Sequence, residues 1–124
     1  MRLVVDASFN HCHPRFFAFA DVAARGPDSE YWDWYEWKEW PVPGSVVSTP
    51  YDADRYYDCW WGFGQMPNLN FDLSRTGPEE QSVTDIEDAE PNWPLVNHLL
   101  DIAESWLGTE DADGYRLDVA SEVP

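Results

Sequence analysis

The chain has 124 residues, which is enough for one small domain but well short of the roughly 250 residues that a complete α/β barrel needs. Seven basic residues against 24 acidic ones give a formal charge of -17, so the chain would repel the phosphates of nucleic acids and anionic lipids. We therefore expect neither a nucleic-acid partner nor a membrane partner.

The N-terminal stretch predicts one strand and one helix. Arg2 to Asp6 is a short buried strand, in which three consecutive apolar residues are followed by a carboxylate. The segment from Ala7 to Pro14 is expected to be a loop. Phe16 to Arg25 is a short helix with one apolar face, and the Gly-Pro pair that follows ends it. A strand that runs into polar residues is typical of how α/β enzymes present their chemistry.

The middle of the chain, from residue 27 to residue 91, is predicted to be irregular. Prolines and glycines recur through it at a density that forbids long regular elements. A loop of this length inside a compact domain is usually functional or forms a subdomain. Aromatic side chains in such loops can stack on sugar rings, although filling a loop-rich core is the more common role for any single one. The candidates for stacking are Trp32, Trp34, Trp37, Trp60 and Trp61.

Two cysteines, Cys12 and Cys59, lack the close spacing of a zinc site or a redox motif. Free thiols in a reducing compartment are the expected interpretation, with a single disulfide as the alternative. No apolar run approaches the roughly 20 residues of a membrane span, and Met1 to Asp6 lacks the apolar stretch of a signal peptide. These features favour a cytoplasmic protein and leave secretion open.

The C-terminal third predicts a second helix and a second strand. Apolar residues recur at helical spacing from Asn92 to Leu107, with Pro94 in the first turn and Gly108 as the stop. Gly114 to Ala120 alternates as a strand does. The order strand, long insertion, helix, strand is a βαβ unit with an enlarged connection, so its strands should be parallel. Two strands bury one helix poorly, which implies further strands beside them.

Arg116 and Asp118 stand two positions apart in this predicted strand, so alternation places both side chains on one face. The guanidinium would keep the carboxylate ionised and oriented. An ionised aspartate at the carboxyl end of a parallel strand is a candidate glycosidase nucleophile, which attacks an anomeric carbon. From Arg-x-Asp alone, a structural ion pair is the more common explanation.

Three separated motifs change that balance. They are Asp6 to His11 (D-A-S-F-N-H), Met66 to Asn70 (M-P-N-L-N) and Gly114 to Ala120 (G-Y-R-L-D-V-A). In this order and at this spacing they resemble the alpha-amylase family, glycoside hydrolase family 13, with its D-x-x-x-N-H, its short motif near the end of domain B and its G-x-R-x-D. The resemblance covers essentially the whole chain, and three motifs in the right order are a strong signal.

The resemblance implies an α/β fold, part of a TIM (β/α)8 barrel that runs from barrel strand 3 to barrel strand 4. Residues 1–9 would be strand 3 and the start of its loop. Residues 10–90 would be a domain B-like irregular insertion between strand 3 and helix 3. Residues 91–124 would be helix 3 and strand 4.

By the same resemblance, Asp118 is the nucleophile and Arg116 is its ion-pair partner. A retaining mechanism takes two carboxyl groups about 5 to 5.5 Å apart, one as nucleophile and one as acid and then base. The family carries that acid on its fifth strand and a stabilising aspartate on its seventh, and both lie beyond this chain. We therefore expect the isolated chain to be inactive and the activity to belong to a parent enzyme.

The resemblance also implies substrate contacts and bears on cofactors. His11 would hydrogen-bond the sugar in the subsite where cleavage occurs, Asp6 and Asn10 would shape the loop beneath it, and Glu122 would lie where leaving-group sugars are held. In calcium-binding members the residue that matches Asn10 is a metal ligand. One side-chain carbonyl is far short of the six to eight oxygens that calcium takes, so no calcium and no other cofactor is predicted.

Two segments carry hints of the subfamily and hence of the substrate. Met66 to Asn70 and Val119 to Glu122 are similar to the M-P-K-L-N and V-A-N-E patterns of neopullulanases, cyclomaltodextrinases and maltogenic amylases, from which Asn68 and Ser121 depart. The expected parent is a retaining alpha-glycosidase acting on starch-type oligosaccharides, cyclodextrins or pullulan, with a homodimer left open. The alternative is a non-catalytic, aromatic-rich carbohydrate-binding or interaction module.

Overall fold

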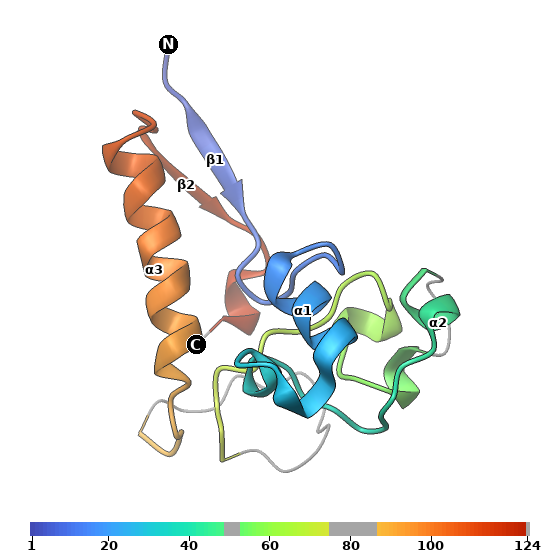
Figure 1. Cartoon of the computed structure of the whole chain (residues 1–124). Helices are drawn as coiled ribbons and strands as arrows, with labels where there is room; N and C mark the ends of the chain where they lie inside the picture. The colour runs from blue at the N-terminus through green and yellow to red at the C-terminus, as the bar shows by residue number, and fades with distance from the viewer. Residues whose placement is uncertain (49–52, 75–86, 124) are drawn as a thin grey trace.

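The computed structural model describes residues 1–48, 53–74 and 87–123 of the chain. Its strands and α-helices are β1 (Val4–Ala7), α1 (Phe17–Arg25), α2 (Gly44–Ser48), α3 (Trp93–Gly108) and β2 (Gly114–Leu117). In Figure 1, β1, β2 and α3 lie side by side, and the chain between β1 and α3 forms a second, loop-rich body. We call the first part the strand–helix–strand unit and the described residues between β1 and α3 the insertion body.

The two strands pair in parallel, as the βαβ interpretation predicts, with Val4 opposite Gly114 and Ala7 opposite Leu117. Asp113 fixes the start of the pair, because its backbone N–H donates to the Leu3 carbonyl at 2.8 Å and its Oδ2 accepts from the Leu3 N–H at 2.6 Å. The parallel order brings the carboxyl ends of both strands to the same edge of the sheet (Figure 1).

Two details of the strand predictions are wrong. The first strand begins at Val4 and is not buried, since Val4 is 56% exposed. A sheet of two strands with one helix leaves much of its surface open to solvent. The second strand ends at Leu117 and not at Ala120, because Val119 adopts a left-handed conformation with φ 43° and ψ 44°, which no strand can include.

Both helices predicted from apolar spacing are confirmed to within one residue at each end. Gly26 ends α1 with φ +60°, and a Cβ atom there would lie 2.8 Å from the Trp40 ring, so only glycine fits this stop. Within the described residues, the insertion body holds only short helices besides α1, in agreement with the predicted irregular middle. These are α2 and the 3-10 turns Gly26–Asp28, Trp32–Trp34, Ala53–Arg55 and Trp60–Gly62.

The insertion body has a core of its own, built largely from aromatic rings. Phe19 of α1 is buried and meets Tyr35 and Tyr57 edge-on, with ring centroids 5.0 and 5.1 Å apart. Edge-to-face contacts of this kind stabilise aromatic clusters beyond the burial of area alone. The core therefore needs no long helices or sheets to close it. Residues 49–52 and 75–86 of the predicted insertion lie outside the described residues.

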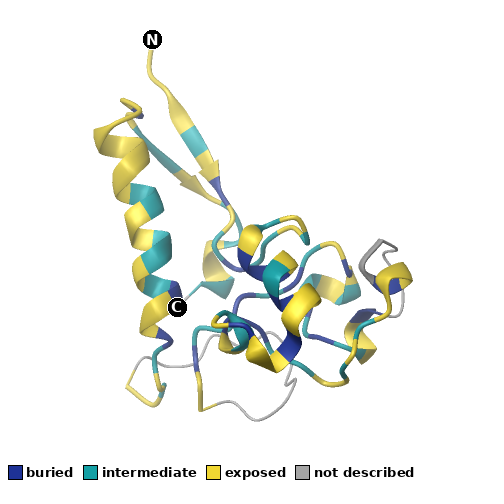
Figure 2. Cartoon of the chain, in the orientation of Figure 1, coloured by how far each residue is buried: buried dark blue, intermediate teal, exposed yellow. Residues whose placement is uncertain are grey.

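The N-terminal end of α3 is anchored in this core. Leu95 is fully buried within it, and Asn92, directly before the helix, is buried as well. The Asn92 amide donates to the carbonyls of Asp33 and Asn70 at 2.8 and 2.9 Å, so one side chain ties three segments together. Leu95 is the buried residue of α3 and lies near this end, whereas Figure 2 shows the last turns of the helix exposed. In the described ranges, no helix has the length and apolarity of a membrane span.

Both cysteines are free thiols, as predicted. Cys12 donates its N–H to the Pro67 carbonyl, while Cys59 pairs with Pro67 from the opposite edge of the segment 66–69. Cys12 and Cys59 thus lie on opposite sides of this segment, two inter-strand spacings of about 4.8 Å apart. That separation exceeds the roughly 7 Å limit between the Cα atoms of a disulfide. Burial raises the pKa of the Cys12 thiol to about 12 and that of Cys59 to about 11. The alternative of a disulfide is therefore wrong.

Candidate active site

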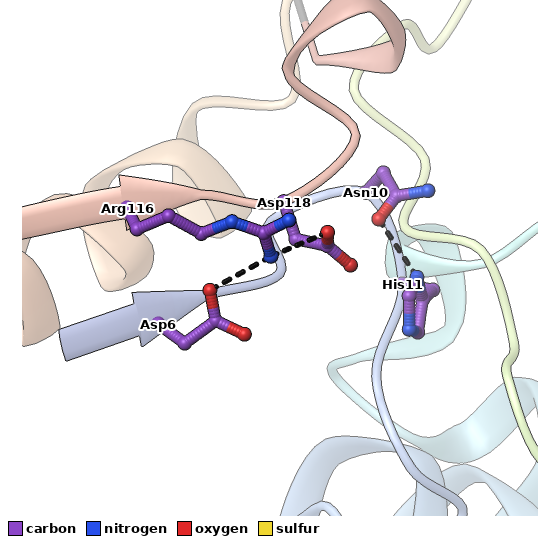
Figure 3. A network of polar contacts seen from close by, with 5 residues as sticks. All are labelled: Asp6, Asn10, His11, Arg116 and Asp118. Atoms are coloured by element: carbon purple, nitrogen blue, oxygen red, sulfur yellow. Dashed lines mark hydrogen bonds and ion pairs between the residues drawn. The ribbon is translucent and has the colours of Figure 1, made fainter.

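The ends of the two strands bring three of the predicted site residues together. Arg116, in β2, directs Nη1 to Asp6 Oδ1 at 2.9 Å and to Asp118 Oδ1 at 2.6 Å (Figure 3). Asp6 stands opposite Arg116 in the parallel register, so its place follows from the pairing of β1 with β2. The two carboxylates raise the pKa of the guanidinium. The largest cause is the hydrogen bond that Asp6 accepts from it, and the charge of Asp118 is the next. Arg116 therefore orients both carboxylates.

Asp118 does not lie within the strand, contrary to the alternation from which it was predicted. It follows the last residue of β2, and its backbone N–H donates to the Ala7 carbonyl at 2.9 Å, which extends the pairing by one more hydrogen bond. Its contact with Arg116 nevertheless forms. The carboxylate thus lies at the open edge of the sheet, held by one backbone bond and one ion pair.

A tight turn after Asp118 carries Glu122 back toward the insertion body. Val119 is left-handed, which is costly for a β-branched residue, and the 3-10 turn Ala120–Glu122 follows with the Glu122 N–H donating to the Val119 carbonyl at 2.8 Å. Glu122 Oε2 then accepts hydrogen bonds from Trp60 Nε1 at 2.8 Å and from Asn10 Nδ2 at 3.3 Å. The strained turn is what makes this long-range contact possible.

The segment Asn10 to Cys12 is held by the M-P-N-L-N motif. The Leu69 N–H donates to the Asn10 carbonyl at 2.9 Å, the Cys12 N–H donates to the Pro67 carbonyl at 3.0 Å, and His11 pairs with Asn68 between them. The motif gave a family resemblance but no structural role when read as sequence. In the fold it is the antiparallel partner that fixes Asn10 and His11.

His11 lies half-buried between two charged groups and an aromatic ring. Its Nδ1 is 2.7 Å from Asn10 Oδ1, and its imidazole stacks on Trp60 with centroids 5.4 Å apart and planes at 17°. Burial lowers the pKa of His11 below its ordinary value, and the charges of Asp118 and Glu122 raise it in part. The charges of Asp118 and Glu122 therefore act on the His11 imidazole, and Figure 3 shows Asp118 near Asn10 and His11.

The tryptophans named as stacking candidates differ in their exposure and in their contacts. Trp34 is buried in the core, so this candidate is wrong. Trp32 and Trp37 pack against the core and stack on each other at 4.9 Å. Trp60 is occupied by His11 and Glu122, a role that its sequence position did not predict. Trp61 is 71% exposed and is the candidate whose ring faces solvent.

By the family resemblance, Asn10 is the position at which a calcium ligand would stand. Both polar atoms of the Asn10 amide are used, one by His11 and one by Glu122. Among the residues with described positions, no group of three or more histidines, cysteines and carboxylates could hold a metal.

This arrangement can orient a nucleophile. Asp118 is partly exposed at the sheet edge, and Arg116 fixes one of its oxygens, which leaves the other to approach a reacting carbon. Glu122 turns its Oε2 to Asn10 and Trp60 and so does not replace the opposing acid that retention requires.

Comparisons with known proteins give one consistent family. The family described as "Alpha amylase, catalytic domain" matches residues 1–124. A cyclomaltodextrinase of Thermoanaerobacter pseudethanolicus is 37% identical over 99% of the chain, and an intracellular maltogenic amylase of Bacillus subtilis is 34% identical over 99% of it. The solved type III pullulan hydrolase of Thermococcus kodakarensis superposes on 98% of the chain with a TM-score of 0.69 and 32% identity. The chain spans only 17%, 16% and 17% of these three proteins.

Proposed function

Since the chain belongs to the alpha-amylase family, glycoside hydrolase family 13, we propose that it is the nucleophile-bearing part of a retaining alpha-glycosidase. In this proposal β1 is barrel strand 3, α3 is helix 3, β2 is strand 4 and the insertion body is domain B. The observation that carries it is the contact of Arg116 with Asp118 at the edge where both parallel strands end. Catalytic carboxylates of TIM barrels lie at that edge.

The chain supplies the first half of a double displacement. The free oxygen of Asp118 attacks the anomeric carbon, a carbon–oxygen bond to the enzyme forms, and the bond to the leaving sugar oxygen breaks. The leaving oxygen takes its proton from an acid that another part of the parent enzyme provides. The same acid group, now deprotonated, takes a proton from water, whose oxygen bonds the anomeric carbon as the bond to Asp118 breaks, which regenerates the Asp118 carboxylate. Arg116 keeps Asp118 ionised and oriented throughout.

The substrate is an alpha-glucan, such as a starch-type oligosaccharide, a cyclodextrin or pullulan. This follows from the names of similar proteins, which include cyclomaltodextrinases, a neopullulanase and a pullulan hydrolase. His11 hydrogen-bonds the sugar at the cleavage point and Glu122 lies near the leaving-group sugars. Asp6 and Asn10 shape the base of the site, and Trp61 offers an exposed ring for stacking.

Two further properties of the parent enzyme belong to the proposal. A cytoplasmic location is supported by the similarity to an intracellular maltogenic amylase and by two free thiols. The proposed reaction uses no metal and no organic cofactor, because the two carboxyl groups suffice for it. A homodimeric parent is part of the proposal.

The proposal is tested by chemistry at Asp118. The open reading frame around the chain should continue to a strand that carries the acid glutamate, and the protein it encodes should release sugars from cyclodextrin or maltotriose. Asp118→Asn should lower kcat by roughly 10⁴-fold or more, as removal of a covalent nucleophile does. Asp101→Asn, at an exposed position of α3, is the matched control and should leave kcat unchanged.

Mass spectrometry gives a second measurement on the same protein. A slow 2-fluoro-glucosyl substrate should add one 2-deoxy-2-fluoroglucosyl group to the peptide that contains Asp118. A label on another residue would contradict the assignment. Turnover by the purified 124-residue chain would contradict the expected need for a separate acid, and sugar binding without turnover by the whole encoded protein would favour the carbohydrate-binding module.

A further inference from the structure

Four side chains from three separate segments form a closed ring of contacts beside Asp118. Asn10 bonds His11 at 2.7 Å and Glu122 at 3.3 Å, and Trp60 bonds the same Glu122 oxygen at 2.8 Å. The ring closes where Trp60 stacks on His11 at 5.4 Å and 17°. Each of the four residues therefore has two neighbours in the ring.

Hydrogen-bond chemistry leaves one arrangement of protons in this ring. A carboxylate oxygen only accepts and an indole N–H only donates, so Glu122 accepts from both Trp60 and the Asn10 NH2 group. With its NH2 group turned to Glu122, Asn10 presents its carbonyl oxygen to His11. That oxygen only accepts, so the hydrogen in this contact is carried by His11 Nδ1.

We propose that Glu122, Asn10 and Trp60 are positioning residues that fix His11 as its Nδ1–H tautomer, so that Nε2 accepts a hydrogen bond from a sugar hydroxyl. The sugar contact rests on the proposed function, whereas the tautomer follows from the four side chains alone. A neutral imidazole that donates at one nitrogen must accept at the other. Burial favours the neutral form, because it lowers the pKa of His11.

Trp60 has two tasks in this network. Its ring lies nearly parallel to His11 and so fixes the plane of the imidazole, which determines where Nε2 points. Its N–H holds the Glu122 oxygen that Asn10 also needs. The left-handed Val119 fits this account, because the turn it forms is what brings Glu122 to Asn10 and Trp60. Strained backbone of this kind is found where a side chain must be held in place.

The test is the nitrogen-15 spectrum of His11 in the 124-residue chain, recorded above the pKa of the imidazole and without any sugar. The wild-type chain should show hydrogen on Nδ1. Glu122→Gln can present a carbonyl oxygen to both donors and should keep this tautomer. Glu122→Met has a similar volume but no acceptor, so the ratio of Nδ1–H to Nε2–H should fall about fivefold, the effect of one typical hydrogen bond.

The matched control is Glu104→Met, the same change at an exposed position of α3, which should leave the ratio as in the wild type. Asn10→Ala removes the carbonyl oxygen that accepts the His11 Nδ1 hydrogen. This variant provides the readout if Glu122→Met does not fold. A wild-type spectrum with hydrogen on Nε2 overturns the inference, as does an unchanged ratio in the folded Glu122→Met and Asn10→Ala chains. Because no sugar is present, this result is separate from any failure to find glycosidase activity.

Discussion

The insertion body and the strand–helix–strand unit differ in how much of their apolar surface they bury themselves. The insertion body encloses Phe19 and Tyr57 among its own rings, although it has little regular structure. The strand–helix–strand unit is regular, yet Leu117 is 50% exposed and the far end of α3 is open to solvent (Figure 2). Regular secondary structure is thus no measure of closure, since a strand or helix needs a partner for each apolar face.

The candidate active site lies where these two parts meet. Asp6, Arg116 and Asp118 come from the strand–helix–strand unit, whereas Trp60 comes from the insertion body. The site's geometry therefore depends on how the two parts are joined. Substitutions in either part, or at the joint between them, can separate their contributions.

The largest effect is expected from a pair of leucines on α3. Leu95 is 0% exposed and Leu107 is 48% exposed, so the same truncation on the same helix compares its two ends. Leu95→Ala should lower the free energy of unfolding by about 2–5 kcal/mol, through lost burial and a cavity. Leu107→Ala should change it by no more than about 0.5 kcal/mol. Urea denaturation followed by circular dichroism measures both, and equal losses would contradict the difference between the two ends.

The joint itself is tested by Asn92. Asn92→Ala leaves the Asp33 and Asn70 carbonyls without their amide partner and should cost about 1–3 kcal/mol of stability. Asn97→Ala, at an exposed position of α3, is the control and should be nearly neutral. Thermal unfolding of both variants measures the difference. If Asn92→Ala is as stable as the control, the amide does not connect the two parts energetically.

The ion pair at the strand ends should contribute little to stability. Arg116 and Asp6 are both mostly exposed, so Arg116→Gln should lower stability little more than loss of an unpaired surface arginine does. The exposed Arg2→Gln change serves as the control in the same denaturation experiment. A loss well above that of the Arg2→Gln control would show a structural ion pair, the alternative to an orienting role for Arg116.

The smallest effect is a pH dependence carried by His11. Its folded pKa lies below the ordinary 6.5, so the unfolded chain takes up a proton first as the pH falls. The contribution of His11 to stability is therefore intact above about pH 6.5 and is lost as the pH falls through the lower folded pKa. His11→Gln should make stability fall less over that interval, whereas the exposed His13→Gln should not. Denaturation at several pH values measures this, and a steeper fall in His11→Gln would contradict the sign.

Local patterns predicted the two strands, the two longer helices and the contact of Arg116 with Asp118. Apolar spacing and the glycine stops predicted α1 and α3, because a helix depends on neighbours three and four residues away. The βαβ order predicted the parallel pairing that puts Asp6 beside Arg116. Alternation brought Arg116 and Asp118 together for a reason that was only partly right, since Asp118 lies past the end of β2.

The order of elements, the three motifs and the charged residues can all be read from the amino acids in order. The contact of Trp60 with Glu122 across 62 positions appears only in the folded chain, as does the pairing of Pro67 to Leu69 with Asn10 to Cys12. The burial of Trp34 and the exposure of Trp61 also emerge only from the fold. These contacts could not be predicted because they join segments far apart along the chain. They depend on turns such as the left-handed Val119, whose conformation no local periodicity encodes.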